Sequence, residues 1–208
     1  FNLSEAQNYA NNHLDEEIIF MLDNGNYGIY YDNNERNKWV KWVGVGNVNF
    51  SYIELADINK KIKSFHEFEN IKISPGKKHP THGYYRGVYL RNSEKIKFTN
   101  TEIIGLGYAS GDASSAIYMQ ETNDILIQNS KIKGNGSKNF AGFEDGIYSR
   151  YSHNITIKNN NIKDCQHAIS AWGKNWVIDN NELSNLDSDG IIIQGISDSI
   201  IKNNKINN

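Results

Sequence analysis

The sequence predicts an all-β solenoid, a parallel β-helix of about seven stacked coils, and three observations predict it. The 208-residue chain contains 31 Asn and 28 Ile but only 2 Pro, which favours short strands joined by Asn-bearing turns. A strand–turn–strand pattern recurs along the chain, and side chains alternate within its strands. One such coil cannot bury its apolar face alone, whereas stacked coils can. We therefore expect a single domain over residues 1–208.

The repeat fixes where each coil lies. Its apolar anchors are Phe98, Ile127, Ile157, Ile178 and Ile201, at intervals of 29, 30, 21 and 23 residues. A second strand precedes each anchor by nine or ten residues, and its inward positions are Val88, Ile117, Ile147, Ile169 and Ile191. An Asn follows each of the last four anchors, so we expect a stacked amide ladder of Asn129, Asn159, Asn180 and Asn203 at one corner.

The two ends of the chain differ. Residues 1–15 are predicted to form a short helical cap, because Ser4–Gln7 has the form of a capping box. Ile18–Leu22 is the first expected strand, and coils occupy residues 16–208. No comparable cap follows the last Asn turn. We expect either that the natural chain continues or that another copy or domain covers this end.

The pattern resembles the right-handed parallel β-helix repeat of pectin-lyase-like proteins over residues 44–208. Right-handedness follows from this resemblance and from the general crossover rule. The resemblance implies a protein of the kind found in secreted polysaccharide-degrading enzymes and phage tailspikes. We therefore expect an extracellular location and a polysaccharide as the partner.

Composition excludes several other classes of function. A net charge of −2 gives no electrostatic case for nucleic acid or an anionic membrane as the main partner. No apolar run is long enough for a spanning helix. The single cysteine, Cys165, cannot form a disulfide framework or a cysteine-based zinc site. We predict no cofactor; Ca²⁺ remains an option, with Asp145, Asp187 and Asp189 as candidate oxygen ligands.

Candidate binding residues lie at outward positions of the second strand and in the loop before it. Equal positions in successive coils lie about 4.8 Å apart, so they form columns. Aromatic faces stack on sugar rings, while Arg and Gln bind hydroxyls and carboxylates. The residues that we assign to substrate binding are His82, Arg86, Tyr118, Tyr148, Arg150, Trp172 and Gln194. Each also has a purely structural interpretation, as outward packing or as a solvated loop.

Asp145, His167 and Asp189 occupy one column and are the candidate catalytic residues. In a hydrolase, one carboxyl group protonates the leaving oxygen and another activates water; two rungs separate these aspartates by roughly 9–10 Å, near the upper end of the inverting range. The layout is similar to polygalacturonase-like glycosidases but lacks their Asp-Asp pair. In a lyase, Tyr148, His167 or Lys174 would be the base, and Arg150 would neutralise a uronate.

Two functions without catalysis remain open. The first is a rigid β-helical shaft or glycan-binding module. The second is a subunit that stacks end to end with other copies into a homo-oligomer or filament. Sequence alone does not decide between these and a polysaccharide hydrolase or lyase.

Overall fold

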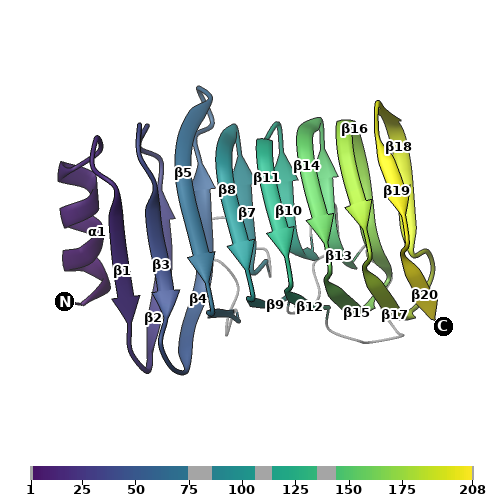
Figure 1. Cartoon of the computed structure of the whole chain (residues 1–208), viewed down its shortest axis with the longest axis horizontal. Helices are drawn as coiled ribbons and strands as arrows, with labels where there is room; N and C mark the ends of the chain where they lie inside the picture. The colour runs from purple at the N-terminus through teal and green to yellow at the C-terminus, as the bar shows by residue number, and fades with distance from the viewer. Residues whose placement is uncertain (1, 75–85, 106–113, 135–143, 208) are drawn as a thin grey trace.

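The computed structural model describes residues 2–74, 86–105, 114–134 and 144–207. In these ranges the chain forms a parallel β-solenoid of about six turns with a short helix, α1 (Leu3–Asn12), at its N-terminal end (Figure 1). The predicted all-β solenoid and the N-terminal helix are confirmed. The number of turns is close to the seven coils expected from the repeat. The two termini lie at opposite ends of the long axis.

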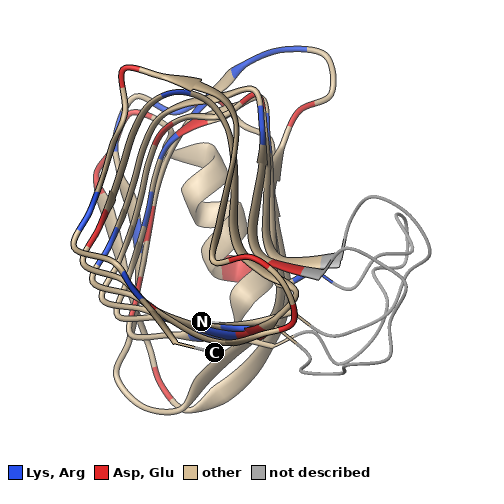
Figure 2. Cartoon of the chain, turned by 90° about the vertical axis from the view of Figure 1, so that its right-hand side faces the viewer, with Lys and Arg blue, Asp and Glu red and all other residues tan. Residues whose placement is uncertain are grey.

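Three columns of strands form the sides of the solenoid. Within each column, a strand pairs in parallel with the strand at the same position in the next coil. Seen along the axis, most coils follow a common outline, and some turns at its lower edge extend beyond it (Figure 2). The first column contains β1 (Ile18–Leu22), β3 (Val40–Gly44), β5 (Ile62–Glu69), β8 (Ser93–Thr99), β11 (Asn123–Gln128), β14 (Ser152–Lys158), the second half of β16 (His167–Asp179) and β19 (Ile200–Lys202).

The second and third columns share their first two strands, β2 (Gly25–Asp32) and β4 (Val48–Ala56). The second column continues through β7 (Val88–Arg91), β10 (Ser114–Gln120), β13 (Glu144–Arg150), the first half of β16 and β18 (Ile191–Ser197). The third continues through β6 (Lys72–Ile73), β9 (Glu102–Ile104), β12 (Lys131–Lys133), β15 (Asn161–Cys165), β17 (Glu182–Leu186) and β20 (Lys205–Asn207).

The core consists of files of side chains, that is, stacks in which equivalent inward residues of successive coils lie on top of one another. The five predicted anchors pair in one register down the first column, and the first four of them are fully buried. Ile201 belongs to the last described rung and is 38% exposed. Toward the N-terminus the files become aromatic, with Tyr30, Trp42 and Phe68 all fully buried. The sequence pattern therefore predicts the inward positions correctly.

The Asn corner exists, but it carries two ladders. The predicted residues have positive φ, which Asn adopts more readily than most residues, and the Asn180 amide donates to Asn159 Oδ1 at 3.0 Å. One residue further on, a buried ladder runs parallel to the first. There Asn160 Nδ2 donates to Asn181 Oδ1 at 3.0 Å, and Asn181 Nδ2 donates to Asn204 Oδ1 at 2.9 Å. The second ladder was not predicted, and it satisfies buried backbone carbonyls as well.

The helical cap begins two residues earlier than predicted. Asn2, not Ser4, is the N-cap: its Oδ1 accepts from Glu5 N at 2.9 Å, and Asn2 N donates to Glu5 Oε2 at 3.0 Å. Both pairs have a polar residue followed three positions later by Glu or Gln, so the motif alone did not distinguish them. At the far end of α1, the buried Arg36 guanidinium donates to Ala10 O at 2.7 Å.

Candidate functional site

The second column brings the three candidate catalytic residues into successive rungs. Asp145 on β13 pairs in register with His167 on β16. In the next coil, Ala168 N donates to Asp189 O at 3.1 Å, which places Asp189 beside His167. His167 Nδ1 lies 3.2 Å from Asp189 Oδ2 and 3.3 Å from the Asp189 backbone N. The structure therefore assembles the predicted column.

The members of this column differ in exposure. Asp145 is 2% exposed and His167 is 5% exposed, whereas the Asp189 side chain is 59% exposed. Burial lowers the pKa of His167, and the neighbouring Asp189 carboxylate partly opposes this by raising it. A hydrolase needs two carboxyl groups that reach the substrate. Only Asp189 is open to solvent, so the geometry fits the two-carboxylate scheme poorly.

The predicted tyrosine column is present but covered. Tyr89, Tyr118 and Tyr148 pair in register, and the Tyr118 and Tyr148 ring centroids lie 5.3 Å apart in a stacked arrangement. The Arg86 guanidinium sits 3.8 Å from the Tyr118 centroid. Tyr118 is only 7% exposed, and its burial raises its pKa. The expectation of an open sugar platform on Tyr118 is therefore wrong, because rings one rung apart bury one another beneath Arg86.

An exposed aromatic pair lies further along the same face. Tyr151 follows β13 directly and is 44% exposed, and its ring centroid lies 4.3 Å from that of the partly exposed Trp172 on β16. The guanidinium of the exposed Arg150 is 5.4 Å from the Tyr151 ring and 6.0 Å from the Trp172 ring. Gln194 pairs in register with Trp172 and is also exposed. Three of the predicted binding residues thus meet at one solvent-facing cluster.

Tyr151 was not predicted, although the sequence contains a signal for it. The corresponding corner positions of the two preceding coils hold Asn92 and Glu121, and all three residues have positive φ. A bulky aromatic side chain in this backbone conformation is uncommon and is often associated with function. Tyr151 is a turn residue, so it is not one of the alternating strand positions that the repeat predicts.

Two further predictions concern His82 and a Ca²⁺ site. His82, most of the loop before Arg86 and most of the two long loops that follow lie outside the described residues. No group of three or more His, Cys, Asp or Glu side chains that could hold a metal ion occurs in the part of the chain that the structure describes. The Ca²⁺ option therefore has no support from the described aspartates.

Comparison with known proteins identifies the family. The family model described as "Right handed beta helix region" matches residues 12–166 and 115–208, which together span most of the chain. The chain is a right-handed beta helix protein. No curated protein and no solved structure matches it.

Two groups of residues in the right-handed beta helix lie apart from each other. They are the aromatic cluster (Arg150, Tyr151, Trp172 and Gln194) and the acidic column (Asp145, His167 and Asp189). Along β16, Trp172 lies five positions after His167, which corresponds to roughly 16 Å of extended strand. Arg150 is equally far along its own strand from Asp145. Arg150 and His167 therefore lie far apart along the strand direction. Within the described ranges, no helix is long and apolar enough to cross a membrane.

Proposed function

We propose that this right-handed beta helix protein binds an extracellular polysaccharide across the outward faces of β13, β16 and β18. The exposed Tyr151–Trp172 pair, with Arg150 beside both rings, is the observation that carries the proposal. Aromatic faces stack on the apolar faces of sugar rings, and a guanidinium donates to hydroxyl or carboxylate oxygens. The rigid strand pairing holds these groups in place without a bound ligand, which lowers the entropic cost of binding.

The test is affinity measurement against a panel of neutral and uronate-containing polysaccharides, with the variants Trp172→Ala and Tyr151→Asn. Asn suits the second position because Asn92 adopts the same backbone conformation two coils earlier. We expect either variant to weaken binding about five- to 150-fold, taking the about 1–3 kcal/mol of a base stacked on an aromatic side chain as the scale for a lost stacking contact. If Arg150→Gln weakens the binding of uronate-containing polysaccharides alone, the ligand is an anionic sugar chain.

Tyr31 provides the matched control. It is 43% exposed and lies on β2 in the second column, with Glu54 as its register partner. Tyr31→Ala removes an aromatic ring of equal exposure at the other end of the solenoid and should leave affinity unchanged. Equal losses for Tyr31→Ala and Trp172→Ala would contradict the proposed position of the site, and no binding to any glycan would favour a shaft without a ligand.

Polysaccharide cleavage is the second candidate function, and the contact between His167 and Asp189 is the observation that favours it. A His with a lowered pKa is neutral near pH 7 and can accept a proton, while a carboxylate beside it can orient the ring. His167→Gln and Asp189→Asn should each lower the rate of release of reducing ends or unsaturated uronates by about 10²-fold or more. Asp187→Asn, which changes an exposed neighbour, should not. Binding with no product in either assay would support a glycan-binding module instead.

A further inference from the structure

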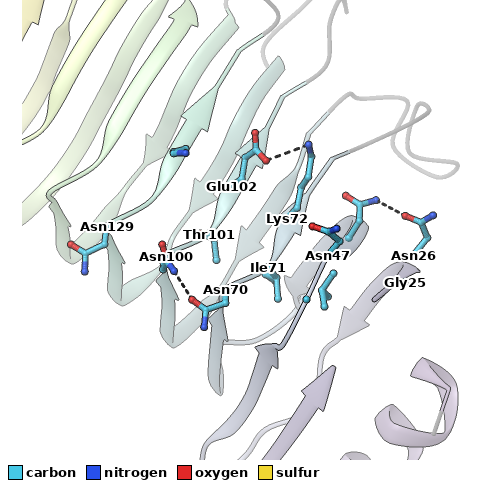
Figure 3. A pocket seen from close by; sticks show the side chains of 14 residues that line it. Gly25, Asn26, Asn47, Asn70, Ile71, Lys72, Asn100, Thr101, Glu102 and Asn129 are labelled. Carbon is cyan, nitrogen blue, oxygen red and sulfur yellow. Dashed lines mark hydrogen bonds and ion pairs between the residues drawn. The ribbon is translucent and has the colours of Figure 1, made fainter. Parts of the chain in front are cut away.

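A hollow lies on a different side of the solenoid from the aromatic cluster, at the corner between the first and third columns (Figure 3). Its volume is about 680 Å³, and it crosses five successive rungs, from Gly25 on β2 to Lys131 on β12. At about 4.8 Å per rung, its length is roughly 19 Å. None of its lining residues belongs to the aromatic cluster or to the acidic column.

The hollow arises from a change in turn type. From Asn70 onward the coils turn on a single Asn with positive φ, whereas β3 and β4 are joined by a longer segment, residues 45–47. In Figure 1, the connections from β1 to β2 and from β3 to β4 reach lower than the Asn corners of the coils that follow. The step between wide and tight turns leaves the groove, and the buried Val48, Ile71 and Thr101 line it.

Amide groups dominate the rim of the groove. The five exposed Asn residues on it are Asn26, Asn47, Asn70, Asn100 and Asn129. Asn100 Nδ2 donates to Asn70 Oδ1 at 2.5 Å, so each of these two side chains keeps one polar atom for another partner. Asn129 is the next step of the same ladder, yet its side chain makes no hydrogen bond within the described residues. The Asn159–Asn180 step, outside the groove, is closed by a hydrogen bond.

Charge along the groove is nearly balanced. Lys72 Nζ lies 3.3 Å from Glu102 Oε2 in an ion pair that spans two rungs of the lining. Lys131 is exposed, and among the described residues it has no acidic partner. A strongly anionic ligand would meet one free cation, whereas the amides offer both donors and acceptors at a regular spacing. This pattern matches a chain of uncharged units that each present hydroxyl groups.

We propose that this groove is a second binding site, and that its ligand is a linear neutral oligosaccharide. The chain lies along the solenoid axis, and the free amide atoms of Asn70, Asn100 and Asn129 exchange hydrogen bonds with hydroxyl groups of successive sugars. Each direct hydrogen bond is modest on its own, so a repeated ladder is needed for specific binding. The site is independent of the aromatic cluster and goes beyond the proposed function.

The test uses side-chain amide NMR signals and titration calorimetry with neutral hexasaccharides of β-1,4-linked glucose, mannose and N-acetylglucosamine. We expect at least one of them to shift the Asn100 and Asn129 amide signals. Asn129→Gly and Asn100→Gly remove the amides while keeping a residue that tolerates positive φ. Each should weaken binding about two- to tenfold, the range for one hydrogen bond.

Asn180→Gly is the matched control, because Asn180 occupies the same corner position and backbone conformation beyond the groove. It should leave the binding that shifts the Asn100 and Asn129 amide signals unchanged. The proposal is overturned if no neutral hexasaccharide shifts these amides, if only an oligogalacturonate does, if Asn180→Gly weakens binding equally, or if Trp172→Ala abolishes all binding. In the last case the aromatic cluster would hold the ligand alone, and the proposed function would stand while this site would not.

Discussion

The N-terminal coils and the C-terminal coils of this solenoid are held together by different means. In the first coils, aromatic side chains fill the interior, and the Arg36 guanidinium connects α1 to the buried Asp32 carboxylate at 2.7 Å. In the last coils, Ile files fill the interior, and the amides of Asn160, Asn181 and Asn204 repeat the same hydrogen bonds from rung to rung. One end therefore depends on contacts that occur once, and the other on contacts that recur.

The non-repeating contacts form one buried network. Arg36 Nε and a terminal guanidinium nitrogen both donate to Asp32 Oδ2, and His66 Nε2 lies 3.3 Å from the same oxygen. The Tyr30 hydroxyl lies 2.7 Å from His66 Nε2. A substitution in this network removes contacts that no other coil repeats. A substitution in the ladder removes one of several equivalent hydrogen bonds. The capped end should therefore be the more sensitive to single substitutions.

The largest effect is expected from Arg36→Met. The substitution removes the cation that faces Asp32, and both side chains are essentially unexposed. Breaking a buried pair typically costs about 3–5 kcal/mol, because an uncompensated charge stays behind. Urea denaturation should report a loss of this size in the free energy of unfolding. Lys202→Met, which breaks an exposed pair with Asp179, should cost less than about 1 kcal/mol.

A smaller effect is expected from Asn181→Ala. Asn181 donates to Asn204 Oδ1 and to Ile157 O, and it accepts from Asn160, so the substitution leaves buried polar groups without partners. The expected cost is about 1–3 kcal/mol in the same denaturation assay. Asn180→Gly, one residue away on the exposed ladder, should change the free energy of unfolding by less than about 0.5 kcal/mol. Equal costs at both positions would remove the distinction between the two ladders.

The smallest effect is expected from mild acid. Burial alone would raise the pKa of Asp32, but hydrogen bonding to His66 and the charges of His66 and Arg36 outweigh it and hold the pKa well below its usual value. A depressed carboxyl pKa adds stability above the unfolded-state pKa of about 3.9, and this contribution falls as pH decreases below it. The loss should therefore approach about 1 kcal/mol at pH 3.

Hydrogen exchange measured by mass spectrometry locates this acid effect. Between pH 7 and pH 3, after correction for intrinsic exchange rates, β1 to β5 should lose more protection than β14 to β17. Asp32→Asn should reduce the difference between the two regions. Uniform loss of protection along the chain would show that the two ends are equally sensitive to acid.

Much of the fold followed from the sequence because its evidence is repeated. The inward positions at Ile127, Ile157 and Ile178 recur in one frame, so each copy supports the others. The capping pair Asn2–Glu5 and the network around Asp32 occur once, and no periodicity points to them. The burial of Tyr118 was missed for a related reason: outward alternation shows which face a side chain takes, but not whether Arg86 covers that face.

The corner that precedes the second column accommodates connections of very different length. A single residue, Gln166, joins β15 to β16, whereas residues 134–143 join β12 to β13. Even so, β13 and β16 pair in continuous register from Asp145 and His167 onward, and β12 and β15 pair in register as well. Segments can therefore be exchanged at this corner without altering the rungs on either side. For protein engineering, this makes the corner a natural place to graft foreign binding loops onto the scaffold.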